Sequence, residues 1–256
     1  MSIIEVIRSV ILGTKKLDTT KLPSQSLFYP KGFEIKIKKA DLEDIITYEF
    51  NYDKDSLFDV IESVKEIVRK NTIYNKLYKF EDIKSVDIVY IFLEIVKFTT
   101  GKPISIPYFN DELGKPDKVE FSSSNFNYYD LSKFKDSHNS EHGYFLVDGY
   151  RFSMPSIGVE NCLTQFLVSK SGDVNAEIWN DYAYDFLFFL CGVNNLSFPE
   201  IENLVIIFNS DMDVSEREKV KLIIENFMGI INYTLKINNR VIDVKAKLDL
   251  EKIWKI

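Results

Sequence analysis

The chain has 256 residues, of which 45% are hydrophobic and 28% are charged, so it can bury a core and is not a disordered protein. Its formal net charge of −7 opposes binding of the whole molecule to nucleic acid or to an anionic membrane. The densest basic cluster, formed by Lys36, Lys38 and Lys39, is interpreted as the solvated face of a strand.

The amino-terminal segment predicts a short helix. One helical face would carry the apolar residues Ile3, Ile7, Val10 and Ile11, and this face needs a partner surface to bury it. The alternative is that the segment is a mobile arm. The same run carries Glu5 and Arg8 and no small-residue cleavage site, which argues against a signal peptide. Two cysteines, Cys162 and Cys191, are expected in the core of a protein from a reducing compartment. We therefore expect a soluble intracellular protein.

Residues 22–32, Leu-Pro-Ser-Gln-Ser-Leu-Phe-Tyr-Pro-Lys-Gly, predict a turn of fixed geometry, here called the double-proline turn. The prolines fix φ and Gly32 can adopt a positive φ, so the turn can hold its large apolar residues at a set angle. Apolar and charged residues then alternate over 33–38 with the two-residue period of a half-buried strand. Six residues are candidate partner contacts: Leu22, Leu27, Phe28, Tyr29, Ile3 and Ile7. The alternative is that the aromatic residues of the turn cover the protein's own core.

Two helices are predicted after this strand. The first begins with the capping-box spacing of Ser56 and Asp59 and continues with apolar residues at helical intervals: Leu57, Ile61, Val64, Ile67 and Val68. The second, over 86–98, is apolar almost all round, which is typical of a central helix covered on several sides. Gly101 is expected to end it.

The middle of the chain changes in character. From 113 to 142 it is rich in Ser, Asn, Asp and Lys and has no helical period, which predicts a long polar connection containing short strands. Such a stretch is a boundary, a partner-binding loop or a linker. The predicted organisation is a turn-strand and helical region at 1–112, the polar connection at 113–142, and a hairpin plus helical region at 143–256.

The last region combines hairpins with helices. Asp148-Gly149 supplies the positive φ values of a type I′ turn, and Asn238-Asn239 tolerates the left-handed conformation that a tight turn needs. The expected elements are a hairpin with arms at 144–147 and 150–154, a helix over 179–190, a helix starting at a capping box at 215–218, and a hairpin with arms at 232–237 and 241–248. The fold class is α+β, with small antiparallel hairpins and a mostly helical C-terminal half.

One catalytic motif is present. His138-Asn139-Ser140-Glu141-His142, here called the histidine segment, has the H-x-x-E-H spacing and contains both histidines of the chain. On a helix the two imidazoles would share a face and could hold zinc, while Glu141 would activate a bound water. Asn, Ser and Gly crowd the motif and a strand is predicted from Tyr144, so we predict a solvated loop. A zinc-dependent peptidase using His138, Glu141 and His142 stays as the alternative function.

Other chemistry is not indicated by the sequence. It has no glycine-rich phosphate loop, and its acidic clusters at 41–44 and 211–213 are interpreted as helix caps and dipole partners. We therefore predict no catalytic residues, no cofactor and no metal, and a protein that is not an enzyme.

The double-proline turn, the strand at 33–38 and the acidic helix start at Asp41 resemble the baseplate hub and hub-assembly proteins of T-even-type contractile-tailed bacteriophages. The apolar helix at 86–98 and the C-terminal helix followed by a hairpin fit the same family. The resemblance implies a structural subunit or assembly chaperone without catalytic residues. Its partners would be other baseplate hub or wedge proteins, and it could form homo- or hetero-oligomers. It would act in the tail baseplate of the virion or in the host cytoplasm during assembly. A generic intracellular adaptor is the other alternative.

Overall fold

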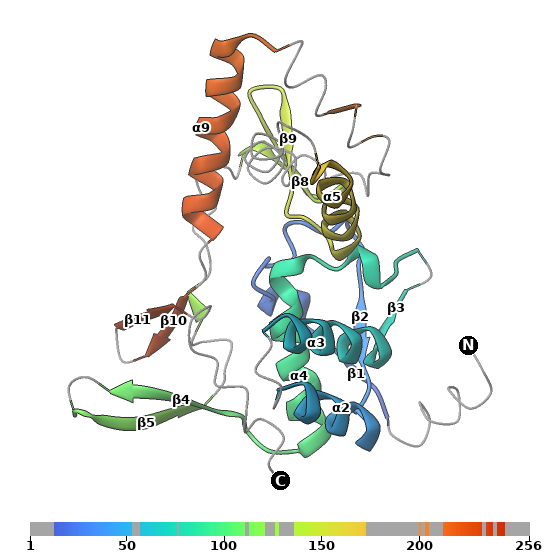
Figure 1. The fold of residues 1–256 in the computed structure, drawn as a ribbon, viewed down its shortest axis with the longest axis vertical. Coiled ribbons are helices and arrows are strands. Elements are labelled where there is room, and N and C mark those ends of the chain that lie inside the picture. Colours follow the sequence, from blue (N-terminus) through green and yellow to red (C-terminus); the bar gives the residue numbers. More distant parts are fainter. Residues whose placement is uncertain are drawn as a thin grey trace.

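The structure is a computed structural model that describes residues 13–52, 57–75, 77–110, 113–120, 126–127, 136–172, 200, 203–204, 212–231, 234–237 and 240–243 (Figure 1). Helices and small antiparallel sheets are both present in these ranges, so the predicted α+β class is confirmed. Several predicted features lie outside them: the N-terminal helix with Ile3 and Ile7, Ser56, the helix over 179–190, Cys191, Asn238-Asn239 and everything after 243.

The first part of the chain builds a small sheet and a helical layer. Its elements are β1 (Lys15–Lys16), the 3-10 helix η1 (Thr19–Lys21), β2 (Ile35–Ile37), α2 (Leu42–Tyr52), α3 (Leu57–Asn71), β3 (Thr72–Tyr74), the 3-10 helices η2 (Phe80–Asp82) and η3 (Ser85–Asp87), and α4 (Ile88–Thr100). The strands form an antiparallel sheet in the order β1-β2-β3, in which Ile35 faces Tyr74 and Ile37 faces Lys15.

The strand predicted at 33–38 contains β2, and the alternation has the expected effect. Ile35 and Ile37 are buried, whereas Lys36 is exposed. The basic cluster is only partly solvated, because the Lys39 ammonium lies 5.7 Å from the centre of the Phe98 ring. The interpretation of the cluster as the solvated face of a strand therefore holds for Lys36, whereas Lys38 and Lys39 follow β2 and are half-buried.

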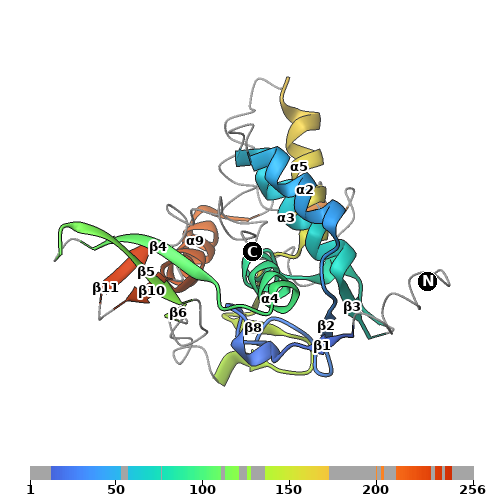
Figure 2. The same cartoon turned by 90° about the horizontal axis from the view of Figure 1, so that it is seen from below.

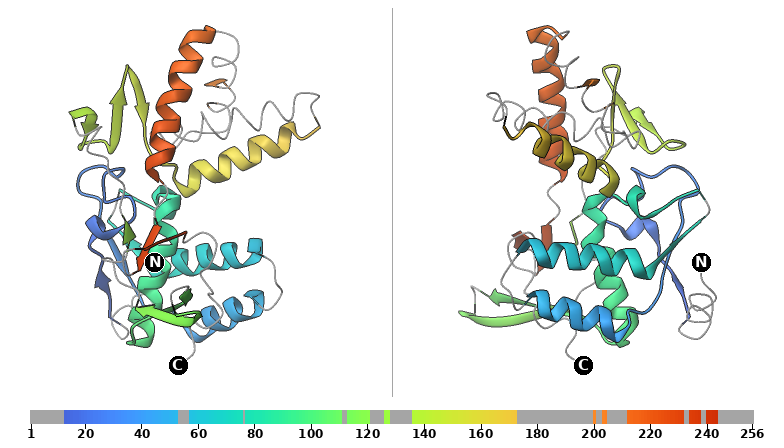
Figure 3. Two further views of the ribbon diagram at one scale, coloured as in Figure 1. Left: turned by 90° about the vertical axis from the view of Figure 1, so that its left-hand side faces the viewer. Right: turned by 45° about the vertical axis from the view of Figure 1, so that its right-hand side comes forward.

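Helix α4 is the centre of the core, as its sequence predicted. Seven of its side chains are buried: Ile88, Tyr90, Ile91, Phe92, Leu93, Ile95 and Val96. Helix α3 packs against both α4 and α2, and Figure 3 shows α2 and α3 on one side of α4. Gly101 ends α4 in the left-handed conformation, with a φ of 67°.

The remaining elements are β4 (Ser105–Asn110), β5 (Lys115–Glu120), β6 (Phe126–Asn127), β7 (His138–Asn139), β8 (Tyr144–Val147), β9 (Tyr150–Phe152), α5 (Ile157–Lys170), α9 (Val214–Ile231), β10 (Thr234–Ile237) and β11 (Arg240–Asp243). Both predicted hairpins form, β8 with β9 and β10 with β11, and the φ values of Asp148 and Gly149 are 52° and 88°. β6 adds to β10, and the β4–β5 hairpin lies beside this sheet (Figures 1 and 2).

Two details of this half differ from expectation. The capping box at Ser215 is not the start of α9, because Asp213 accepts a hydrogen bond from the Glu216 amide (2.9 Å) and caps the helix two residues earlier. Cys162, expected in the core, is a half-buried free thiol on α5. None of the described helices is both long enough and apolar enough to cross a bilayer.

Candidate functional site

The double-proline turn and the histidine segment, which the sequence presents as separate features, pack against each other. The backbone amide of Lys31 donates to the carbonyl oxygen of Glu141 over 3.2 Å. The Nε2 atom of His138 lies 2.8 Å from the carbonyl oxygen of Leu27. The two most distinctive stretches of the sequence therefore form one structural unit.

Gly143 allows this close approach. It has a φ of 71°, and a Cβ at this position would lie 2.5 Å from the carbonyl carbon of Tyr29 and 2.8 Å from that of Phe28. The Phe28 ring then packs on Phe145 of β8, with 5.5 Å between ring centres. Only a residue without a side chain can occupy this position while the backbones stay in contact.

The turn is buried in the protein's own core. Leu22, Phe28 and Tyr29 are 0%, 1% and 3% exposed, and Leu27 is half-buried. The expectation that the first three contact a partner is therefore corrected for this conformation, and the alternative, that they belong to the core, is supported. The physical reason is that the histidine segment and β8 cover the turn from a distant part of the chain.

A buried polar network fixes the turn to the start of α4. Asp87 accepts two hydrogen bonds through its carboxylate, from the Ser24 amide (2.8 Å) and from the Tyr29 hydroxyl (2.7 Å). The same hydroxyl accepts a hydrogen bond from the Lys84 amide (2.9 Å). The network joins the turn to η3 through groups that are all shielded from water.

Burial shifts the ionisation of three of these groups. It raises the pKa of Asp87 to about 6, although hydrogen bonds from Ser24 and Tyr29 act in the opposite direction. It lowers the pKa of Lys84 to about 8, and the negative charges of Asp87 and Asp82 oppose that shift. The pKa of Tyr29 is raised well above its usual value by burial and by the Asp87 charge. Asp87 and Lys84 are consequently both mainly ionised between pH 6 and pH 8.

A cavity of about 150 Å³ lies between three segments of the chain: the turn, the stretch leading into η3, and the region from the histidine segment to β9. Lys84 and Ser153 both line it, and the Lys84 Nζ donates to the Ser153 Oγ over 3.3 Å. The Ser153 hydroxyl in turn donates to the Gly143 carbonyl over 3.1 Å. His142 also lines this space. The cavity, with Lys84 beside it, is the candidate functional site.

The histidine segment does not have the geometry of a zinc peptidase motif. His138 is in strand β7 and His142 is in the turn before β8, so the two imidazoles do not share a helix face. The prediction of a non-helical segment is confirmed. The segment is not a plain solvated loop, however, because His138 is half-buried with its ring 4.7 Å from that of Phe145. Within the ranges that the structure describes, no three His, Cys, Asp or Glu residues are grouped as metal ligands.

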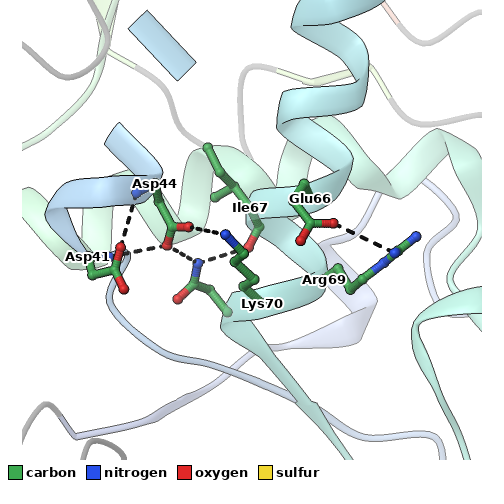
Figure 4. A network of polar contacts seen from close by, with 7 residues as sticks. Asp41, Asp44, Glu66, Ile67, Arg69 and Lys70 are labelled. Carbon is green, nitrogen blue, oxygen red and sulfur yellow. Dashed lines mark hydrogen bonds and ion pairs between the residues drawn. The ribbon is translucent and has the colours of Figure 1, made fainter. Parts of the chain in front are cut away.

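The acidic start of α2 forms a second polar network (Figure 4). Asp41 accepts from the Asp44 amide (3.0 Å), and the buried Asp44 carboxylate accepts from the Asn71 side chain (2.9 Å) and lies 3.4 Å from the Lys70 ammonium. Asn71 also donates to the Ile67 carbonyl (2.9 Å). The contacts of Asp44 tie α2 to α3. The hydrogen bond from the Asp44 amide to Asp41 confirms the interpretation of Asp41 as a helix cap.

Sequence reasoning did not single out Lys84, Asp87 or Ser153. The available signal was a lysine and an aspartate in the few residues before a helix that is apolar almost all round; both residues are buried in the structure. Comparison with known proteins finds no matching family model, no similar curated protein and no similar solved structure. The resemblance noted for the turn therefore stays a prediction.

Proposed function

We propose that the protein is a non-enzymatic structural or assembly protein of a phage tail baseplate hub, working through protein–protein contacts in the virion or in the host cytoplasm. The proposal rests first on the resemblance carried by the double-proline turn, the strand after it and the acidic helix start at Asp41. In the structure these residues are architectural, since the turn is tied to α4 through Asp87. A rigid framework of this kind lowers the entropy cost of binding at the outer surface.

The observation that carries the contact role is the outer face of α2. Leu42 and Ile46 are one helical turn apart and are 70% and 55% exposed. The other side of the same helix is buried through Asp44 and Tyr48. A surface helix normally presents polar residues to water, and adjacent exposed apolar residues favour a contact surface. We therefore assign partner contact to Leu42 and Ile46 in place of the buried turn.

The experiment is a pull-down of baseplate components with the tagged protein. The Leu42→Ser, Ile46→Ser double variant is expected to keep the wild-type melting temperature and to lose at least tenfold in capture, because each buried apolar side chain contributes about 1.5–3 kcal/mol. Val168→Ser on α5 is the matched control, since Val168 is 68% exposed. Equal capture by the double variant and the wild type would contradict the assignment to α2.

Particle composition separates the two versions of the proposal. A fixed stoichiometry in purified baseplates identifies a structural subunit, and presence only in infected lysate identifies an assembly chaperone. Binding to no baseplate component refutes both and leaves the generic adaptor. The peptidase alternative requires stoichiometric zinc and loss of hydrolysis in Glu141→Gln, and no contact of the histidine segment favours it.

A further inference from the structure

We propose that the cavity beside Lys84 is a covalent binding site for a small uncharged aldehyde or ketone, which the Lys84 Nζ atom holds as an imine. This inference is independent of the contact surface on α2 and goes beyond the proposed assembly role. It assigns a ligand to a site that an assembly protein does not require.

Geometry supplies the first argument. Lys84 is 6% exposed, yet it lines a cavity of about 150 Å³ instead of being enclosed by side chains on all sides. A volume of about 150 Å³ is enough for a molecule the size of benzene. There is therefore room for a carbonyl compound of about six non-hydrogen atoms next to the amine.

The orientation of the amine supplies the second argument. The Ser153 hydroxyl donates its own hydrogen to the Gly143 carbonyl, so it acts as an acceptor toward the Lys84 Nζ. A neutral amine can give one hydrogen to that acceptor and keep its lone pair for attack. Ser153 is thus a positioning residue for the nucleophile.

The ionisation of Lys84 favours the same reaction. With the pKa lowered to about 8 by burial, roughly a quarter of the amine is neutral at pH 7.5, against roughly one part in a thousand for an ordinary lysine. Among the described residues, the titratable groups around it include Asp82 of η2, Asp87 of η3, Tyr29 of the turn, and Tyr78 and His142 across the cavity. The fraction of reactive amine is therefore roughly two hundred times that of a surface lysine.

The reaction balances without a redox partner. The Nζ lone pair forms a bond to the carbonyl carbon, and one amine proton moves to the carbonyl oxygen to give a carbinolamine. The remaining amine proton then passes to that oxygen, which leaves as water while the nitrogen lone pair forms the carbon–nitrogen double bond. Asp82 beside the cavity and the buried Asp87 repel an anionic carbonyl compound such as a keto acid. The two carboxylates thus select an uncharged one.

Reductive trapping in the wild-type protein tests the site. Glycolaldehyde is added at pH 7.5 with cyanoborohydride, which delivers hydride to the imine carbon, and each lysine is followed by peptide mass spectrometry. Lys84 is expected to react at least tenfold faster than Lys16 and Lys219, whose side chains are 58% and 54% exposed. Glyoxylate, an anionic aldehyde of similar size, is expected to label Lys84 more slowly than glycolaldehyde does.

The outcomes decide the proposal in either direction. Labelling of Lys84 no faster than that of Lys16, or only after unfolding with urea, overturns it. Equal labelling by glyoxylate overturns the selection of uncharged carbonyls. In the Lys84→Met variant, the fast-reacting population is expected to disappear while the labelling rates of Lys16 and Lys219 stay the same.

Discussion

Replacing Gly143 by alanine tests the packing of the histidine segment on the turn. The new Cβ would lie 2.5 Å from the carbonyl carbon of Tyr29, 2.7 Å from its oxygen and 2.8 Å from the carbonyl carbon of Phe28. These are backbone atoms of a proline-bounded turn, so they cannot rotate away as a flexible side chain would. The substitution must separate two segments that share a backbone hydrogen bond and an aromatic contact.

Two costs add in Gly143→Ala. The left-handed conformation at a φ of 71° costs about 1–2 kcal/mol once a Cβ is present. Overpacking against a rigid neighbour costs about 1–3 kcal/mol more. We therefore expect the free energy of unfolding to fall by about 2–5 kcal/mol.

Gly149→Ala is the matched control. Gly149 has a φ of 88°, and a Cβ added there would meet no atom within 4 Å, so this substitution carries the conformational cost alone. Urea denaturation followed by far-UV circular dichroism gives both free energies. Gly143→Ala is expected to lose about 1–3 kcal/mol more than Gly149→Ala. Equal losses would refute the close approach of Gly143 to the turn.

Two further predictions concern the buried network. Tyr29→Phe removes the donor to Asp87 and the acceptor of the Lys84 amide, so the free energy of unfolding should fall by about 2–4 kcal/mol. The control is Tyr144→Phe, which removes one hydrogen bond from a half-buried residue and should lower the free energy of unfolding by less than about 1 kcal/mol. Similar losses in both variants would contradict the network. The second prediction concerns pH. The pKa of Asp87 is about 6 in the folded chain against 3.8 ordinarily, so the native state binds more protons than the unfolded state over this range. The contribution of Asp87 to the free energy of unfolding therefore falls by on the order of 3 kcal/mol as pH rises from 4 to 6. The lowered pKa of Lys84 acts oppositely, and its contribution rises from pH 8 to 10.5. Asp87→Asn should remove the first slope and Lys84→Met the second in denaturation series across pH; slopes unchanged in these variants would refute the assignment.

Local sequence signals predicted the elements that depend on near neighbours. The alternation around Ile35 needs only a two-residue period, and the Asp148-Gly149 turn needs only residues that tolerate positive φ. The apolar run of α4 indicated a central helix for the same reason. The start of α9 was misplaced because Asp213 and Ser215 are similar N-caps, and sequence spacing alone does not choose between them.

The candidate site depends instead on contacts across long separations. Asp87 is held by residues about sixty positions earlier, and Lys84 reaches Ser153, 69 positions later. No periodicity links such positions, so the burial of the turn and the cavity beside Lys84 could not be derived from the chain alone. The exposed face of α2 could not be predicted either, because apolar residues such as Leu42 and Ile46 are expected in the core.

The contact between His138 and Leu27 also bears on the zinc alternative. A carbonyl oxygen can only accept a hydrogen bond, so the His138 Nε2 atom at 2.8 Å carries the hydrogen. A zinc ion bound at Nε2 would need the lone pair of that same atom. Metal binding there would therefore break a contact that holds the histidine segment on the turn, next to Gly143, where the backbones already touch. The spacing that resembles a catalytic motif is thus used by the fold, and His138 acts as a hydrogen-bond donor to the double-proline turn.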